Sequence, residues 1–267
     1  MSSEVRTVNG GAQRLVHRGL RKGRSLVSRV IDAVAQPRRR VLQPSQPLSE
    51  QLDAPLIAWL NYHQHKVLGS QCTWLGHKAL KNPLDAWVYQ EILSELKPDV
   101  VIEIGNKFGG STLFLACVMD MLGHGTVLAL DLDHSRFTAF HPRIELVTGD
   151  CSAPDVVERI RMRCAGKSVL VIHDADHSRA AVARDLDLYA PMVTPGSYLI
   201  VEDSVQGIPG FSSAVNRDYG EFALPDTDSP LQGIADFLST HPEFEVDSRR
   251  ERYILTSNPL GFLRRVR

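Results

Sequence analysis

The segment Asp99-Val-Val-Ile-Glu-Ile-Gly105-Asn-Lys-Phe-Gly109-Gly-Ser-Thr112 joins a short β-branched run to the start of a helix. An uninterrupted apolar run of this length, rich in valine and isoleucine, is typical of a buried strand in a parallel sheet. The glycines that follow let the backbone approach a ligand closely, and the first turn of a helix offers it free N–H groups. The segment therefore predicts an α/β fold with a ligand-binding turn after its first strand.

The alternation of strand and helix continues after this segment. Further strands are expected at residues 126–131, 144–149, 168–174, 196–203, 244–246 and 253–256. Strands that alternate with helices form a mostly parallel sheet with right-handed crossovers. We therefore expect a Rossmann-like α/β domain over residues 99–267, with a seven-stranded sheet and helices on both faces.

Two further regions precede this domain. Residues 48–98 have a helical apolar pattern and are expected to form a helical lid region. Residues 1–47 form a basic arm, in which residues 1–40 hold ten Lys and Arg side chains against Glu4 and Asp32, a net charge of +8. Part of this arm, residues 14–40, could form an amphipathic helix that contacts an anionic membrane surface. A solvated tail, or a helix packed on a neighbouring subunit of a homo-oligomer, is the alternative.

The composition favours a globular enzyme of the cytoplasm, with the inner face of the membrane as the other location considered. Hydrophobic residues make up 43% and charged residues 23%, and no apolar run is long enough to span a bilayer. The four cysteines lack CxxC spacing and are expected to be reduced thiols, which excludes a disulfide framework or a zinc site. No nucleic-acid partner is expected.

Residues 204–229 form an irregular stretch after the fifth predicted strand, with turns at Gly207, Pro209-Gly210 and Pro225. Loops of this length inside compact domains are usually functional or disordered. Its position above the carboxyl edge of the sheet predicts a loop that contacts the acceptor substrate.

The carboxyl ends of the first three strands are the expected cofactor site, because open α/β sheets bind ligands there. The candidate binding residues are Glu103, Gly105, Gly109, Ser111, Asp131 and Asp150. In a dinucleotide-binding GxGxxG turn the second glycine follows the first by two residues. Here the next glycine after Gly105 is Gly109, so the spacing does not fit. The helix N-terminus after the turn suits the carboxylate of a methionine moiety as well as a phosphate.

Other interpretations stay open for these residues. The glycines could simply join strand to helix. Asp131 could accept both hydroxyls of a ribose, which does not separate one nucleotide class from another. Asp150 could bond an adenine amino group or cap the helix that begins near Pro154.

The fourth and fifth strands end in three acidic residues, Asp174 and the pair Glu202-Asp203. Adjacent parallel strands lie about 4.8 Å apart, so these carboxylates should converge. Such a cluster is costly unless a cation neutralises it, and oxygen ligands favour magnesium or a similar ion. His177 follows Asp174 closely and is the candidate general base; a helix-capping or solvent-facing histidine is the alternative.

Several motifs stand in order along the chain: Trp74-Leu-Gly76, Lys81-Asn-Pro83, Val101-Ile-Glu-Ile-Gly105, Asp174-x-Asp-His177-Ser and Val201-Glu-Asp203-Ser. Together they resemble the cephalosporin hydroxylase/rhamnosyl O-methyltransferase family, from about residue 55 to the end.

This resemblance implies a class I methyltransferase fold that uses S-adenosylmethionine and Mg²⁺. It implies metal ligands at Asp174, Glu202 and Asp203 and a base at His177. The expected acceptor is a sugar hydroxyl of a glycan or glycolipid, either a small molecule or lipid-linked. Two alternatives remain: methylation or tailoring of a small antibiotic or polyketide-like scaffold, and an NAD-dependent oxidoreductase or inactive nucleotide-binding module.

Overall fold

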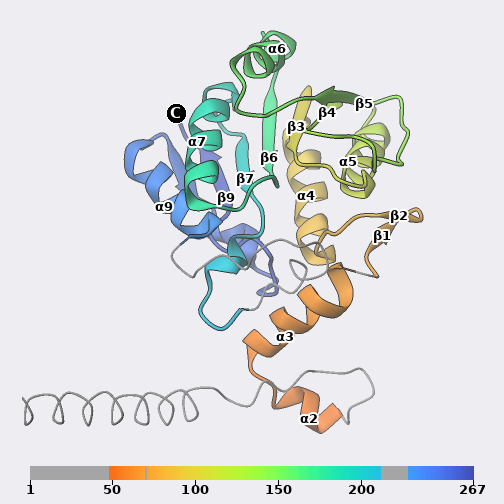
Figure 1. Cartoon of the computed structure of the whole chain (residues 1–267), viewed down its shortest axis with the longest axis vertical. Coiled ribbons are helices and arrows are strands. Elements are labelled where there is room, and N and C mark those ends of the chain that lie inside the picture. The colour runs from red at the N-terminus through yellow and green to blue at the C-terminus, as the bar shows by residue number, and fades with distance from the viewer. Residues whose placement is uncertain (1–47, 70, 212–227) are drawn as a thin grey trace, which may run out of the picture. The chain divides into compact units, whose positions relative to one another are not determined.

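The β-branched run forms strand β3 (Val100–Ile104), all five residues of which are buried. It lies inside the sheet, parallel to β4 (Thr126–Asp131) on one side and to β6 (Val169–His173) on the other (Figure 1). The computed structural model describes residues 48–69, 71–211 and 228–267. The described residues belong to the unit Gln43–Arg267.

Seven strands form the sheet, in the order β5-β4-β3-β6-β7-β9-β8. The remaining strands are β5 (Ile144–Thr148), β7 (Tyr198–Val201), β8 (Phe244–Val246) and β9 (Phe262–Arg265). The strands from β5 to β7 are parallel, and β9 runs antiparallel to both of its neighbours. The predicted mostly parallel, seven-stranded sheet is confirmed.

The last predicted strand was placed wrongly. Residues 253–256 are irregular, and the seventh strand is β9. Ile254 has a φ of +67°, which extended backbone does not allow, and the side chain of Thr256 bonds Asp85 instead of facing a neighbouring strand. The two arginines that end β9 hid its strand character.

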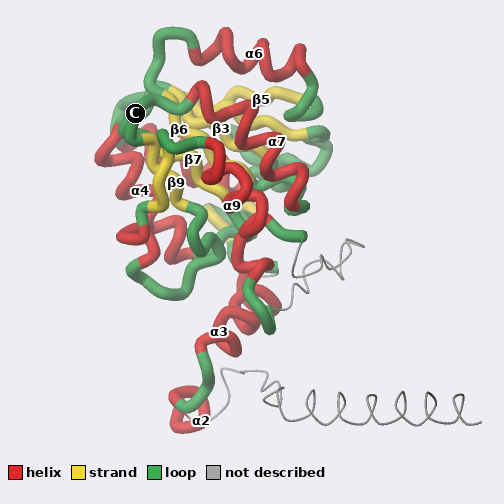
Figure 2. Tube along the Cα trace, turned by 90° about the vertical axis from the view of Figure 1, so that its left-hand side faces the viewer, coloured by secondary structure: helices red, strands yellow, loops and turns green. Residues whose placement is uncertain are grey.

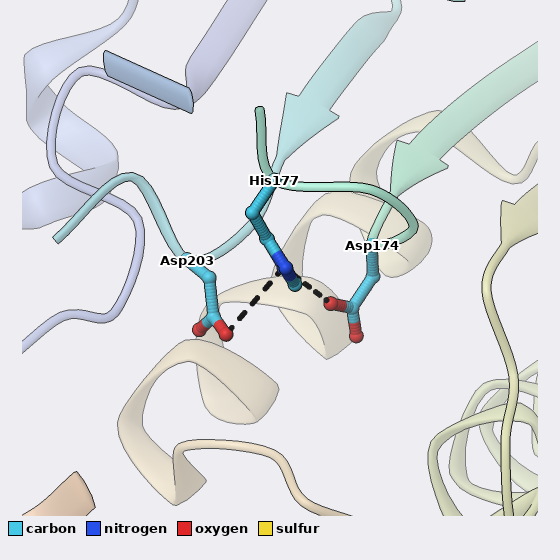
Figure 3. A group of neighbouring side chains, drawn as sticks. All are labelled: Asp174, His177 and Asp203. Atoms are coloured by element: carbon cyan, nitrogen blue, oxygen red, sulfur yellow. Dashed lines mark ion pairs between the residues drawn. The ribbon is translucent and has the colours of Figure 1, made fainter. Parts of the chain in front are cut away.

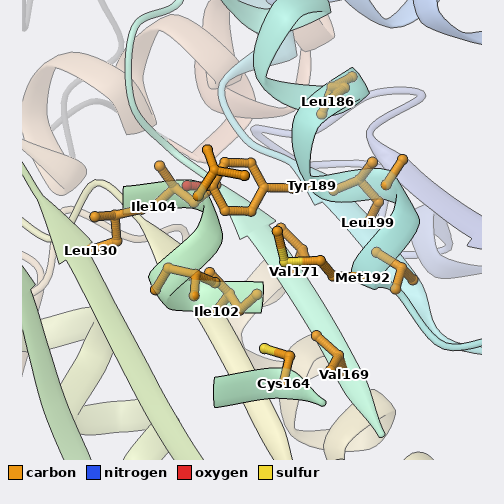
Figure 4. Close-up of a cluster of buried hydrophobic side chains, with 14 of the residues drawn as sticks. Ile102, Ile104, Leu130, Cys164, Val169, Val171, Leu186, Tyr189, Met192 and Leu199 are labelled. Atoms are coloured by element: carbon orange, nitrogen blue, oxygen red, sulfur yellow. The ribbon is translucent and has the colours of Figure 1, made fainter. Parts of the chain in front are cut away.

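Alternate strand residues face opposite sides of the sheet and build two apolar cores. Val101 and Leu170 pack under α4 (Pro83–Leu96) and α5 (Gly110–Met121). Ile102 and Val171 face the other core (Figure 4). That core is covered by α6 (Pro154–Cys164), α7 (Arg179–Tyr189) and α9 (Pro230–Thr240) (Figure 2). Helices thus cover both faces, as expected.

The region expected to be helical contains a hairpin that the apolar pattern did not predict. Its helices before α4 are α2 (Leu48–Leu52), α3 (Leu56–Tyr62) and the π-helix η1 (His63–Leu68). The hairpin pairs β1 (Thr73–Trp74) with β2 (His77–Lys78). Among the described residues further along, three segments form 3₁₀ turns: η2 (Ala190–Met192), η3 (Ser204–Gly207) and η4 (Ser248–Glu251).

Two regions singled out from the sequence fall wholly or partly outside the described residues. The basic arm, residues 1–47, is one, and residues 212–227 of the expected acceptor loop are the other. Within the described part of the chain, no helix combines the length and apolar character that crossing a bilayer requires.

Candidate metal and cofactor site

A cavity of about 1010 Å³ lies at the carboxyl ends of the central strands. The chain runs from β3 to β4 and β5 in one direction and then returns to β6 and β7 on the other side of β3. The cavity therefore opens at the point where the strand order reverses, which is where open α/β sheets bind ligands. Five of the predicted site residues that line it come from four different strand ends: Gly105, Asp131, Asp174, His177 and Asp203.

Gly105 brings the turn after β3 against the loop after β6. Its φ is +90°, and a Cβ at this position would lie 1.9 Å from the backbone oxygen of Asp174. Only glycine fits there, because a side chain would push the two loops apart. Gly109 caps α5 with a φ of +82°, and a Cβ there would lie 2.7 Å from the ring of Phe137.

Glu103 is fully buried and supports the turn from beneath. Its Oε2 accepts hydrogen bonds from Asn106 Nδ2 at 2.9 Å and Thr112 Oγ1 at 2.5 Å. Among the described residues, neither Glu103 nor Gly109 belongs to the cavity lining, whereas Ser111 does. Glu103 and Gly109 thus shape the turn rather than face the cavity.

Asp131 and Asp150 both line the cavity but hold different bonds. The Oδ2 of Asp131 accepts from the backbone N–H groups of Asn106 at 2.8 Å and Lys107 at 2.9 Å, which ties the end of β4 to the turn after β3. The Oδ1 of Asp150 accepts from the N–H and the hydroxyl of Ser152, both at 2.8 Å. Asp150 therefore orders the turn before α6.

Asp174, His177 and Asp203 converge at the cavity (Figure 3). His177 Nε2 lies 3.5 Å from Asp174 Oδ1 and 3.6 Å from Asp203 Oδ2. One ligand atom from each of the three residues lies within 4.8 Å of the others. Two carboxylates at this spacing fit a hard divalent cation, with the imidazole of His177 beside them.

Glu202 lies outside this group of three. Its side chain is buried, with Oε1 accepting from Tyr89 Oη at 2.9 Å and Oε2 accepting from Lys81 Nζ. The same Lys81 ammonium donates to Asp174 Oδ2 at 3.2 Å. Lys81 thus links Glu202 to Asp174, and Asp203 follows Glu202 directly in the chain.

The charges of this cluster are not balanced. Burial raises the pKa of Glu202 well above its usual value despite Lys81, and Asp174 adds to the rise. Burial also raises the pKa of Asp203, which His177 only partly offsets. Burial acts the same way on Asp174, but Lys81 and His177 lower its pKa more, and the pKa falls below its usual value. Three carboxylates exceed the charge of one ammonium, and a divalent cation would neutralise the excess.

Lys81 and Tyr89 are site residues that the sequence analysis did not predict, although Lys81 begins the Lys81-Asn-Pro83 motif. Burial lowers the pKa of Lys81, but Glu202 and Asp174 raise it more, so the ammonium stays charged. The physical signal in that motif is the start of a helix: Asn82 caps α4 by accepting from Leu84 N at 3.0 Å, with Pro83 at the first helical position. That signal fixes where Lys81 lies on the chain but not which strand ends it meets.

Comparison with known proteins gives consistent matches. The family model described as Rhamnosyl O-methyltransferase/CmcI matches residues 66–266. A rhamnosyl O-methyltransferase of Mycobacterium tuberculosis is 31% identical over 227 residues, which covers 79% of this chain and 85% of that protein. A rhamnosyl O-methyltransferase of Mycobacterium leprae is 44% identical over 138 residues, which covers 49% of this chain and 60% of that protein.

Solved structures of CmcI have the same fold. The form with Mg and SAM superimposes with a TM-score of 0.56 at 23% identity, covering 85% of this chain and 87% of that one. The apo form gives a TM-score of 0.55 at 22% identity, with the same coverage. Their likeness confirms the Rossmann-like methyltransferase fold.

Proposed function

The chain belongs to the rhamnosyl O-methyltransferase/CmcI family, and we propose that it transfers a methyl group from S-adenosylmethionine to a sugar hydroxyl with the assistance of Mg²⁺. The observation that carries the proposal is the meeting of Asp174, His177 and Asp203 at the cavity beside the Gly105 turn. A methyl donor and an acceptor hydroxyl must meet at one place. In this cavity, strand ends of the kind that bind nucleotides lie next to an acidic cluster.

Residues at the ends of β3 and β4 would hold the cofactor. Asp131 would accept the ribose hydroxyls, and the turn of Gly105 and Ser111 would receive the methionine moiety. Glu103 and Gly109 hold this turn in shape from behind. Asp150 lies at the adenine end, where its carboxylate accepts from the amino group.

Asp174 and Asp203, with Glu202 beside them, would hold the divalent cation, which when bound would supply Lewis-acid polarisation of the acceptor hydroxyl. His177 removes the hydroxyl proton onto Nε2. The acceptor oxygen then forms a bond to the methyl carbon as the bond from carbon to the sulfonium sulfur breaks, which leaves S-adenosylhomocysteine. Asp174 and Asp203, about 3.5 Å and 3.6 Å from His177 Nε2, stabilise the imidazolium that results.

Ligand binding tests this assignment directly. S-adenosylmethionine together with MgCl₂, at about 100 times their dissociation constants, should stabilise the folded chain by about 2.7 kcal/mol or more. For a domain of this size that is a rise in Tm of roughly 5–10 °C. NAD should leave Tm unchanged in a parallel scan. Stabilisation by NAD, with none by S-adenosylmethionine, would instead identify a nicotinamide enzyme.

The acceptor is a sugar hydroxyl of a glycolipid or glycan, and the name of the relatives, rhamnosyl O-methyltransferase, supports a rhamnosyl group as that sugar. The basic arm supports a lipid-linked acceptor at the inner face of the membrane, because residues 1–40 carry a net charge of +8. The four cysteines are free thiols, which suits the reducing cytoplasm.

Labelled methyl transfer into extracts separates the acceptor classes. With S-adenosylmethionine and Mg²⁺, label should enter the glycolipid fraction, and linkage analysis should find it as a methyl ether on a sugar. Deleting residues 1–40 should reduce transfer to vesicle-embedded glycolipid while sparing the detergent-dispersed form. If label is found only in small non-sugar metabolites, the acceptor is an antibiotic-like scaffold and not a sugar.

A further inference from the structure

Strand β7 ends in two adjacent acidic residues that both reach the surroundings of Asp174, Glu202 through Lys81 and Asp203 through His177. Glu202 is 4% exposed and reaches Tyr89, whereas Asp203 reaches the cavity and His177. Neighbouring residues of an extended chain point to opposite sides, so directing both carboxylates to one cluster requires an irregular backbone. The φ of Asp203 is +57°, in the left-handed region, which a residue with a side chain keeps only where its surroundings hold it there.

The segment 255–259 holds this irregular turn. Asn258 Oδ1 accepts from the backbone N–H of Asp203 at 3.1 Å, and Ser257 O accepts from the N–H of Val205 at 3.1 Å. Ser204 Oγ donates to Pro259 O at 2.6 Å. Three hydrogen bonds therefore fix the backbone that carries Asp203.

Asn258 also reaches Glu202, through one intermediate side chain. Its Nδ2 donates to Tyr89 Oη at 2.8 Å, and Tyr89 Oη donates to Glu202 Oε1 at 2.9 Å. The direction of these bonds follows from Asn258: its Oδ1 accepts from a backbone N–H, so its Nδ2 is the donor to Tyr89 Oη, and the hydroxyl proton of Tyr89 is directed to Glu202. Asn258 is 1% exposed and Tyr89 is 2% exposed, so water does not compete for these bonds.

Asn258 is itself anchored to helix α4. Its N–H donates to Thr256 Oγ1 at 2.9 Å, and Thr256 Oγ1 donates to Asp85 Oδ1 at 2.6 Å. The other oxygen of Asp85 accepts from the N–H of Ser257 at 2.8 Å. The anchor is buried, because Asp85 is only 2% exposed.

We propose that Asn258 is a positioning residue that sets both acidic side chains at the end of β7 for the cation: Asp203 through its backbone N–H and Glu202 through Tyr89. The inference rests on the proposed function. Outer partners of this kind fix the orientation of metal-binding carboxylates, and their loss typically costs about 10- to 100-fold in metal affinity.

The chain offers a matched control for Tyr89. Tyr198 is also 2% exposed, and its Oη accepts from Arg250 Nε at 3.1 Å and donates to Asp247 Oδ2 at 2.7 Å. It lies at the first residue of β7, at the end of the strand away from Glu202. Tyr198→Phe therefore deletes a buried tyrosine–carboxylate bond without touching the proposed site.

The experiment measures Mg²⁺ and Mn²⁺ binding by titration calorimetry for the wild type, Tyr89→Phe, Asn258→Ala and Tyr198→Phe, with Tm and S-adenosylhomocysteine affinity recorded in parallel. Metal affinity should fall about 10- to 100-fold in Tyr89→Phe and further in Asn258→Ala, because the second change also frees Asp203. Tyr198→Phe should lower Tm and leave metal affinity unchanged. Affinity for S-adenosylhomocysteine should stay at the wild-type value in all three.

If Tyr89→Phe and Tyr198→Phe have the same metal affinity and a comparable fall in Tm, the inference is overturned. The proposed function is not affected by that result. If Asn258→Ala does not fold, the comparison of the two tyrosine variants still decides. A wild-type chain that binds neither Mg²⁺ nor Mn²⁺ would overturn the proposed function and this inference together.

Discussion

Replacing Asp174 by asparagine is expected to reduce methyl transfer on the order of 10³-fold, because a metal ion contributes several kcal/mol of transition-state stabilisation. Asparagine keeps the shape of the side chain but removes the charge that faces both His177 and Lys81. The backbone of Asp174 stays packed against Gly105, so the cofactor turn is preserved. The measurement is kcat with saturating Mg²⁺, together with calorimetric binding of Mg²⁺ and S-adenosylhomocysteine.

His177→Ala is compared with this variant, because loss of the base should lower kcat without lowering Mg²⁺ affinity, whereas loss of a metal ligand should lower both. A base contributes to the chemical step, so kcat should fall about 10²-fold or more while Mg²⁺ affinity stays near that of the wild type. Asp174→Asn should lose both. If His177→Ala loses Mg²⁺ affinity as well, His177 is a fourth ligand and not the base. Full turnover in Asp174→Asn would remove the acidic cluster from the mechanism.

Lys81→Met should destabilise the cation-free chain by about 3–5 kcal/mol, the usual cost of breaking a buried ion pair by removing one partner. The ammonium is buried between Glu202 and Asp174, and methionine fills its volume without its charge. Urea unfolding at neutral pH in EDTA measures the loss. Mg²⁺ should restore part of it, since the cation neutralises the same carboxylates.

Lys78→Met is the matched control for Lys81. Lys78 also lines the cavity, but its ammonium lies 4.9 Å from the centre of the Phe108 ring instead of between buried carboxylates. Its loss should cost about 1 kcal/mol or less. An Lys81→Met chain as stable in EDTA as Lys78→Met would show that Lys81 does not hold the acidic cluster together.

Local pattern was sufficient to predict most of the fold. The apolar run at β3 and its repeats at β4, β6 and β7 are buried over nearly their whole length, so their composition alone marks them as strands. Strand β9 was missed because Phe262 and Leu263 are followed by two arginines. Its place between β7 and β8 depends on pairing with distant residues, which composition does not encode.

For the site, too, local sequence predicts some residues, whereas others depend on contacts between distant parts of the chain. Strand ends could be read from the sequence, and they brought Asp174, His177 and Asp203 to one cavity. Lys81 lies 93 residues from Asp174 in the chain and 121 from Glu202, so no spacing rule connects it to either. Asn258 likewise meets Tyr89 across 169 residues. Such contacts follow from how α4 and the 255–259 segment pack, which only the folded structure gives.

The close contact between Gly105 and the backbone of Asp174 couples the two loops, so a substitution in one affects the other. One added carbon at Gly105 would collide with the carbonyl that carries the Asp174 loop, at 1.9 Å. A substitution at Gly105 in the turn after β3 would therefore displace the loop that carries Asp174. In a genetic screen, a lesion at position 105 would be mistaken for damage to the neighbouring site, although no residue of that site had changed.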